Sequence, residues 1–137
     1  MKDITFRPIG VVHSPLKDGS SAPRQPKWSE FEGEIEIFPE FVEGLEGLGD
    51  LESIVVVFNF DRHEGYSMKV TPPHRTSECG VFASRSPRRP NGIGISTLKL
   101  LSVEGNILRV SGVDMLDGTP VLDIKPDISE GFFQNRG

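Results

Sequence analysis

Short apolar runs, separated at close intervals by glycine and proline, constrain the fold of this chain more than any other feature. The 15 glycines and 11 prolines favour many turns over long helices. Seven runs rich in apolar and β-branched residues predict strands at 6–14, 33–38, 54–60, 79–84, 96–103, 107–113 and 119–124. One short helix is expected to begin at Pro39 and to stop at Gly49, because apolar residues between them have helical spacing. The pattern predicts a mainly β fold, a small antiparallel β-barrel of about seven strands with one short helix.

The length of 137 residues favours a single domain over residues 1–137, with enough chain to bury a core. Cys79 is the only cysteine, so it cannot form an internal disulfide. The three histidines show no metal-ligand spacing, and we expect no metal site. The N-terminus lacks an apolar leader, and the longest apolar run, 54–58, is far too short to span a membrane. We therefore expect a cytoplasmic protein without membrane contact.

Acidic and basic residues are segregated along the chain. The formal net charge is −5, which by itself argues against a nucleic-acid partner. Residues 30–52, however, hold nine of the 20 acids and none of the 15 lysines and arginines. The remainder of the chain therefore carries 11 acids against 15 bases. This segregation permits RNA to meet a local basic face while the acidic segment faces away.

Residues 80–96 form the most informative stretch, with the sequence GVFASRSPRRPNGIGIS. Proline fixes φ and glycine frees it, so the backbone should determine the shape of this loop. Arg85, Arg88 and Arg89 offer planar forks of donors that suit carboxylate or phosphate. The stretch favours an anion-binding loop. The alternative interpretation is a solvated surface turn that is merely basic.

The common nucleotide-binding signatures are absent from the sequence. Gly92-Ile93-Gly94 lacks the third glycine of the dinucleotide fingerprint and runs into a predicted strand instead of a helix. The chain has no P-loop, and three scattered histidines do not define a Ser-His-Asp constellation. A Rossmann fold is therefore excluded, and any cofactor would be held by an unusual site.

Two polar stretches leave their roles open. Residues 61–64, which follow a predicted buried strand, are four consecutive ionisable residues that can line a pocket or form a solvated loop. Residues 15–29 form a long polar loop, and its Pro-Arg-Gln-Pro sequence is stiffened at both ends, which favours a function. Trp28 in this loop is either a stacking platform or a lid over the core.

The sequence DGTP at residues 117–120 is by itself only a hairpin signal. Asp123 and Lys125 follow two residues apart on a predicted strand, so they point to one face. They either form a pair with the arginine loop or lie on the surface.

Several of these stretches together resemble the TsaA-like, or TrmO, family. The motifs occur in order and span residues 9–126: IGV at 9–11, HSP at 13–15, PRQ at 23–25, GVFASRS at 80–86, RPNGIG at 89–94 and DGTPVLDIKP at 117–126. Members of this family are S-adenosylmethionine-dependent methyltransferases that methylate N6 of threonylcarbamoyladenosine at position 37 of tRNA, beside the anticodon. The resemblance implies a β-barrel without a Rossmann sheet, the tRNA anticodon loop as partner, and a homodimer with the cofactor near the subunit interface.

The resemblance also assigns residues to the site. Carried over by motif, the cofactor-binding residues are Pro23, Arg24, Gln25, Asp61, Arg62, Arg85, Ile95, Asp117, Gly118, Thr119 and Pro120. The threonylcarbamoyl group carries a carboxylate, for which Arg88, Arg89 and Lys125 are candidates. Methyl transfer is an in-line displacement that depends mainly on positioning. We assign no general base, although Asp61, His63 and Asp117 are candidates for one.

The chain departs from the family pattern in two places. Residues 61–62 are Asp-Arg, where bacterial relatives have a His-Gln pair. Longer bacterial relatives carry a C-terminal extension implicated in tRNA recognition, whereas this sequence ends at Gly137, and we expect a short form without it. Two alternatives to the tRNA methyltransferase are therefore kept: methylation of a different substrate, either a small molecule or another RNA position, and a non-catalytic module that binds cofactor or RNA.

Overall fold

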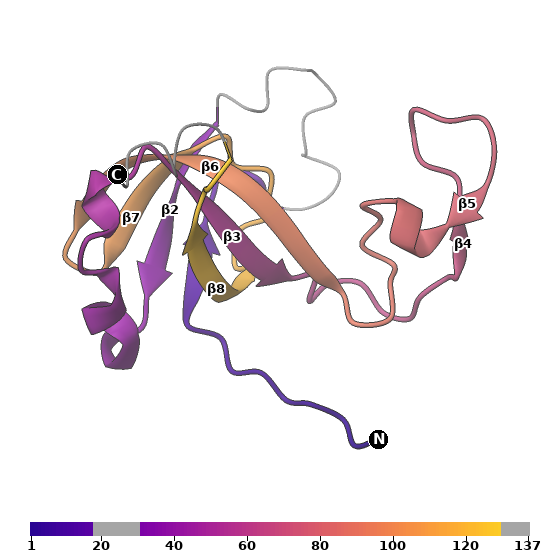
Figure 1. Ribbon diagram of the computed structural model, residues 1–137, viewed down its shortest axis with the longest axis horizontal. Coiled ribbons are helices and arrows are strands. Elements are labelled where there is room, and N and C mark those ends of the chain that lie inside the picture. Colours follow the sequence, from indigo (N-terminus) through magenta and orange to yellow (C-terminus); the bar gives the residue numbers. More distant parts are fainter. Residues whose placement is uncertain (18–30, 130–137) are drawn as a thin grey trace.

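A closed antiparallel barrel forms the body of the molecule (Figure 1). The computed structural model describes residues 1–17 and 31–129. The barrel strands are β1 (Gly10–His13), β2 (Glu32–Ile37), β3 (Ser53–Asn59), β6 (Ile93–Glu104), β7 (Ile107–Ser111) and β8 (Pro120–Pro126). Their order is β1-β2-β7-β6-β3-β8, and β8 pairs with β1 to close the barrel. The predicted mainly β barrel is confirmed, with six strands in its wall.

Alternating side chains fill the interior of the barrel. In β3 buried and half-buried residues alternate along the whole strand, and β6 alternates between buried and exposed over residues 93–100. This alternation follows from the two-residue repeat of an extended strand. The centre of the core is made of side chains that are at most 1% exposed: Ile35, Ile54, Val56, Leu98, Leu108 and Val110. Because these side chains fill the barrel, its sites for ligands lie at its ends and on its outer surface.

Two short 3₁₀ helices occupy the stretch for which the spacing predicts one helix. They are η2 (Pro39–Leu45) and η3 (Leu48–Asp50), with Gly47 at φ +86° before the second. That left-handed conformation costs glycine little and interrupts a continuous helix. The apolar side chains that predict the helix do pack against the barrel core, namely Phe41, Val42, Leu45 and Leu48. The predicted apolar face is therefore confirmed although the helix is divided.

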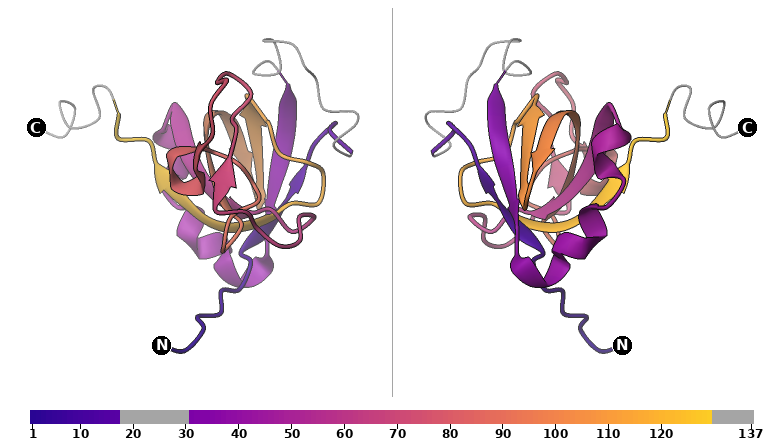
Figure 2. Two further views of the ribbon diagram at one scale, coloured as in Figure 1. Left: turned by 90° about the vertical axis from the view of Figure 1, so that its right-hand side faces the viewer. Right: turned by 90° about the vertical axis from the view of Figure 1, so that its left-hand side faces the viewer.

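Residues 61–92 leave the barrel between β3 and β6, and we call them the arm. The arm projects to one side of the barrel, on the right of Figure 1, and faces the viewer on the left of Figure 2. It contains a two-stranded sheet in which β4 (Lys69–Val70) pairs with β5 (Cys79–Gly80). A sheet of two short strands is marginal by itself, so the arm depends on other contacts.

The strand predicted at residues 79–84 is mostly not formed. After β5 the chain turns into a 3₁₀ helix, η4 (Val81–Ala83). Ser84 closes this turn, because both its backbone N–H and its hydroxyl donate to the carbonyl of Val81, at 3.1 and 2.8 Å. Such a local side-chain bond offers the backbone an alternative to a strand ladder.

The remaining boundaries shift by a few residues. The first strand is shorter than predicted, and the N-terminal residues before Ile9 extend away from the barrel (Figure 1). Strand β6 begins at Ile93 instead of residue 96, directly after Gly92, which has φ +60°. Strands β6 and β7 are joined by a hairpin turn in which Gly105 has φ +61°. Among the described residues, the structure contains no helix with the length and apolar character needed to cross a membrane.

Candidate functional site

The DGTP turn, residues 117–120, is bonded to the segment that follows β1. The N–H of Asp117 donates to the carbonyl of Leu16 at 2.6 Å, and the N–H of Gly118 donates to the carbonyl of Val12 at 2.7 Å. Gly118 has φ +88°, and a Cβ at this position would lie 3.1 Å from Nη2 of Arg62. The left-handed backbone therefore favours glycine here, and a Cβ would also crowd the Arg62 guanidinium.

Ser14 braces the same turn from inside. Its hydroxyl donates to the carbonyl of Met115 at 2.8 Å and accepts from the N–H of Leu16 at 3.1 Å, and the residue is 6% exposed. Its backbone N–H donates to Oδ1 of Asp117 at 3.0 Å, and Nζ of Lys17 lies 3.2 Å from Oδ2. The hydrogen bond from Ser14 is the main reason that the pKa of Asp117 is lowered.

Arg62 connects the two sides of this arrangement. It stands just beyond the end of β3, and its Nη1 donates to the carbonyl of Lys17 at 3.0 Å. Its Nη2 donates to the carbonyl of Asp117. The guanidinium thus binds backbone oxygens from two segments that are about a hundred residues apart in the chain.

A pocket of about 210 Å³ opens beside this cluster. Its walls are side chains from the end of β3 and from the loop before β8: Phe58, Phe60, Asp61, Arg62, His63, Asp114, Met115, Leu116 and Thr119. The Thr119 hydroxyl donates to the carbonyl of Leu116 at 2.6 Å, which fixes that wall. Of the two interpretations of residues 61–64, pocket lining is therefore confirmed for Asp61, Arg62 and His63.

Arg85 and Ile95 form a second group. Nη1 of Arg85 donates to the carbonyl of Ile95 at 3.2 Å, and the Ile95 side chain is 48% exposed on β6. Arg85 also lines a larger pocket of about 870 Å³ on the arm, together with His74 and Phe82. Within the described chain, no hydrogen bond or ion pair connects this group to the Arg62–Asp117 cluster.

The arginine loop is held in shape by its own backbone and side chains. Nη1 of Arg89 donates to the carbonyls of Ser84 and Ser86, at 2.9 and 3.1 Å. The Arg89 guanidinium is therefore partly occupied by the loop itself, while Arg88 is exposed. The prediction of a loop shaped by its backbone is confirmed by Gly92 at φ +60° and by its N–H, which donates to the carbonyl of Arg89 at 3.2 Å.

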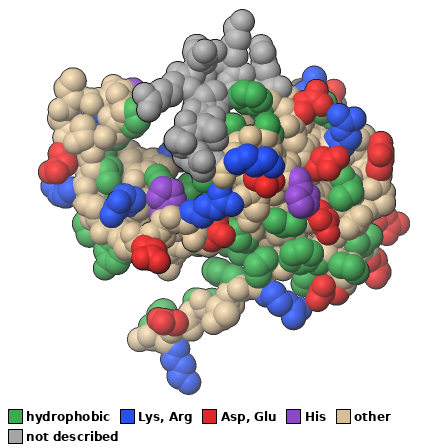
Figure 3. All heavy atoms as spheres, turned by 180° about the vertical axis from the view of Figure 1, so that it is seen from behind, with side chains coloured by type: hydrophobic (Ala, Val, Ile, Leu, Met, Phe, Trp, Pro, Cys, Tyr) green, Lys and Arg blue, Asp and Glu red, His purple; other side chains and the backbone are tan. Residues whose placement is uncertain are grey.

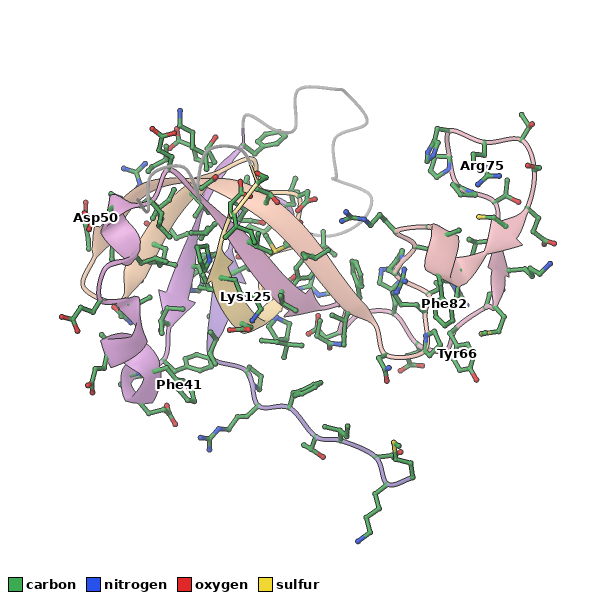
Figure 4. The ribbon with its side chains drawn as sticks, in the orientation of Figure 1. Phe41, Asp50, Tyr66, Arg75, Phe82 and Lys125 are labelled. Atoms are coloured by element: carbon green, nitrogen blue, oxygen red, sulfur yellow. The ribbon has the colours of Figure 1, made fainter. Side chains whose placement is uncertain are left out.

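Lys125 does not join the arginine loop. Its Nζ lies 2.9 Å from Oδ2 of Asp123, and both side chains are about half exposed or more. Lys125 pairs with Val55 across the sheet, whereas the loop meets β3 at its far end, where Ile93 pairs with Asn59. In Figure 4 the labelled Lys125 lies on the barrel, away from the arm. The surface interpretation of Asp123 and Lys125 is therefore confirmed.

Some of the predicted residues are not described by the structure. Pro23, Arg24, Gln25 and Trp28 lie outside the described residues. The described chain brings Asp61, Arg62 and the 117–120 turn together at one end of the barrel. The sequence interpretation gave no role to Ser14, Leu16 or Lys17, although Ser14 belongs to the HSP motif. The position of the HSP motif directly before a long polar loop is the sequence feature that indicates a role for these residues.

Basic side chains gather beside the cluster. Seen from behind, Lys, Arg and His side chains form a row across the middle of the surface, between the arm and the barrel (Figure 3). Around the cluster itself, Lys17, Arg62 and His63 are exposed. In the described ranges no group of three or more His, Cys, Asp or Glu side chains is arranged to hold a metal ion. The surface therefore suits an anionic ligand.

Comparisons with known proteins agree with this architecture. Residues 11–131 match the family model described as the tRNA-methyltransferase O N-terminal domain. The chain is 45% identical over 128 residues to a probable S-adenosyl-L-methionine-binding protein of Pyrococcus abyssi, covering 93% of this chain and 70% of that protein. It is 40% identical over 136 residues to the mouse tRNA (adenine(37)-N6)-methyltransferase, covering 93% of this chain and 32% of that protein.

A solved structure shares the fold. The crystal structure of TrmO from Pseudomonas aeruginosa superposes with a TM-score of 0.76 at 38% identity, covering 93% of this chain and 57% of that chain. This chain therefore spans little more than half of the crystallised TrmO and about a third of the mouse protein. The family match extends over both halves of the site, from the segment after β1 to the DGTP turn. The chain belongs to the family of the tRNA-methyltransferase O N-terminal domain.

Proposed function

We propose that this chain is an S-adenosylmethionine-dependent methyltransferase that methylates N6 of adenosine 37 in tRNA, with threonylcarbamoyladenosine as the target nucleoside. The relatives support the two halves of this proposal. The Pyrococcus abyssi protein is named for binding the cofactor, and the mouse protein is named for methylating adenine 37 at N6. Both are at least 40% identical to this chain.

The main structural support for the proposal is that Arg62 binds the DGTP turn beside a pocket of about 210 Å³. The pocket combines the apolar rings of Phe58 and Phe60 with polar groups at its rim, as small-molecule sites usually do. Asp61 offers a carboxylate that can face a sulfonium, and Thr119 and Pro120 offer backbone atoms. The predicted Pro23-Arg24-Gln25 segment would complete this side of the cofactor site.

The arginine loop is proposed to receive the nucleic acid. The threonylcarbamoyl carboxylate calls for a guanidinium, and Arg88 has an exposed side chain for it. Arg89 is proposed to shape the loop in addition, since its Nη1 binds two of the loop's carbonyls. A contact of Lys125 with the substrate stays a prediction, and its pairing with Asp123 does not favour it.

We further propose that two copies of the chain pair through the arm and the adjoining half of β6. The exposed apolar side chains on these elements are Tyr66, Met68, Phe82, Ile93 and Ile95, exposed by 39–73%. The arm has few apolar neighbours of its own, and a second copy would cover this surface. Arg85 lies on the arm, so this pairing would place it at the subunit interface, where the family resemblance expects the cofactor.

Release of S-adenosylhomocysteine tests the enzymatic part of the proposal. Purified protein, S-adenosylmethionine and tRNA carrying threonylcarbamoyladenosine should release S-adenosylhomocysteine in excess of the enzyme. Protein that binds S-adenosylmethionine in calorimetry but releases no product would favour the non-catalytic binding module. Release with a small molecule or another RNA, but not with this tRNA, would favour the different-substrate alternative.

A further inference from the structure

We propose that Arg62 is a positioning residue that clamps the segment 14–17 to the DGTP turn, and that its effect on cofactor binding comes from this clamp. The proposal rests on the proposed function, because it concerns the same site. It changes the role of a residue that the family motif assigns to cofactor contact. The basis is that Nη1 and Nη2 each donate to a protein carbonyl, those of Lys17 and Asp117, so the guanidinium joins two segments of the chain.

The geometry suits a clamp because the two acceptors belong to different segments. Lys17 lies in the segment after β1, and Asp117 begins the turn before β8. A guanidinium presents its donors in a rigid planar fork, so it can bridge two carbonyls that a single amine would hold less well. The bond from the Asp117 N–H to the Leu16 carbonyl, at 2.6 Å, lies in the same bridge. Arg62 therefore reinforces a backbone pairing from the outside.

The position of the clamp gives it influence over the cofactor site. Arg62 lies at one wall of the proposed cofactor site. Arg62, Leu116 and Thr119 also line the pocket of about 210 Å³. Holding Lys17 and Asp117 together therefore fixes Arg62 and the adjoining turn, which form part of the wall of this pocket. Without the clamp, the binding-competent arrangement would be a smaller fraction of the population, and every ligand of the site would bind more weakly by that fraction.

A clamp and a carboxylate ligand predict different results for two ligands. S-adenosylhomocysteine carries the amino-acid carboxylate, whereas 5′-methylthioadenosine has the same nucleoside without it. Loss of a clamp weakens both ligands by the same factor, because the site itself is less populated. Loss of a carboxylate ligand weakens only S-adenosylhomocysteine.

The experiment measures the affinity of both ligands by calorimetry in the wild type and in Arg62→Ala, Arg62→Lys and Arg109→Ala. Arg109 is the matched control, since its Nη2 lies 2.9 Å from Oε1 of Glu32 on the barrel surface. We expect Arg62→Ala to lower the affinity for both ligands about tenfold. The affinities of Arg62→Lys should lie between those of Arg62→Ala and the wild type, and Arg109→Ala should bind both ligands as the wild type does. A loss confined to S-adenosylhomocysteine, or no loss for either ligand, would overturn the proposal.

Amide hydrogen exchange of the ligand-free protein gives a second readout. The N–H groups of Asp117 and Gly118 are bonded to Leu16 and Val12, so their protection reports the pairing that Arg62 reinforces. Arg62→Ala should raise exchange in peptides covering residues 10–17 and 113–121 and leave strand β3 unchanged. Unchanged exchange in both peptides would overturn the clamp. Because this readout needs no ligand, it separates a failed clamp from a wild type that binds neither nucleoside, which would contradict the proposed function instead.

Discussion

The backbone N–H of Ser14 donates to the side chain of Asp117 at 3.0 Å, across 103 positions of the chain. This bond ties the end of β1 to the turn that begins β8, at the point where the barrel closes. The carboxylate also lies 3.2 Å from the ammonium of Lys17. Asp117 is therefore an acceptor that organises the borders of the site, in addition to its proposed role in cofactor binding.

This relationship predicts a pH dependence. The pKa of Asp117 in the folded protein is lowered from 3.8, chiefly by the Ser14 hydrogen bond, so the unfolded chain binds the proton first as pH falls. The stabilisation is complete above about pH 4 and is lost as pH falls through the lowered pKa. Asp117→Asn should therefore lose less thermal stability than the wild type as pH falls below 3.8, measured by circular dichroism.

Asp127 provides a comparison for this measurement. Its pKa is also lowered, by hydrogen bonds from Ser129 and Ser53, and it lies beyond the opposite end of β8. The effects of Asp117→Asn and Asp127→Asn on the pH dependence should add, because the sites share no partner. An Asp117→Asn variant as acid-sensitive as the wild type would contradict the assignment.

The buried hydroxyl of Ser14 gives a prediction about stability. Ser14→Ala removes a donor to the Met115 carbonyl and an acceptor for the Leu16 N–H, in a residue that is 6% exposed. Leaving these backbone groups unpaired should lower the free energy of unfolding by about 1–3 kcal/mol in urea denaturation. Ser102→Ala is the matched control, because the Ser102 hydroxyl is buried without a hydrogen-bond partner in the described chain. Its removal should be neutral or stabilising, and equal losses in the two variants would refute the role given to Ser14.

Much of the barrel is predictable from the sequence, and the reasons are visible in particular strands. Strands β2 and β3 lie within one residue of their predicted ranges, because period-two alternation in β2 and a β-branched run in β3 are local signals. The strand predicted at residues 79–84 is mostly wrong, because the apolar character of Val81 and Phe82 does not show which of them is buried. Val81 is buried, whereas Phe82 is 73% exposed on the arm.

The site is predictable only in outline. The DGTP turn and the strand end at 61–62 are recognisable by motif, and the structure brings them together. The partners of Arg62 are not predictable. They are the backbone carbonyls of Lys17 and Asp117, and because every residue has such a group, the sequence does not show which ones accept a hydrogen bond. They meet only because β8 pairs with β1 to close the barrel. The ion pair between Lys125 and Asp123 is local. Residues two apart on a strand lie on the same face, so the sequence already indicates that this pair can form.

Arg85 is predicted to contribute to cofactor affinity. Its guanidinium uses Nη1 for the Ile95 carbonyl and retains other donors for a carboxylate. Arg85→Ala should weaken S-adenosylmethionine binding by roughly 1.5–3 kcal/mol, the cost of a lost charged hydrogen bond, as measured by calorimetry. Arg75→Ala is the control, since Arg75 lies at the tip of the arm (Figure 4). Unchanged affinity in Arg85→Ala would remove Arg85 from the site.

The exposed ring of Phe82 predicts the state of assembly. If two copies pair through the arm, Phe82→Asp buries a charge in the interface and should raise the dimer dissociation constant about tenfold or more in sedimentation equilibrium. Ile128 is 51% exposed and lies outside the arm and β6, so Ile128→Asp should leave the dimer intact. A wild type that is monomeric, or a Phe82→Asp variant that dimerises equally well, would contradict the proposed interface.

Methyl transfer to N6 of adenosine 37 can be followed with a labelled methyl group. The direct measurement incubates the purified protein with S-adenosylmethionine labelled in its methyl group and with one tRNA, prepared with and without threonylcarbamoyladenosine at position 37. We predict that label enters only the modified tRNA and that nucleoside analysis finds it on N6 of threonylcarbamoyladenosine. Failure to label the modified tRNA, by protein that binds the cofactor in calorimetry, would contradict the claim.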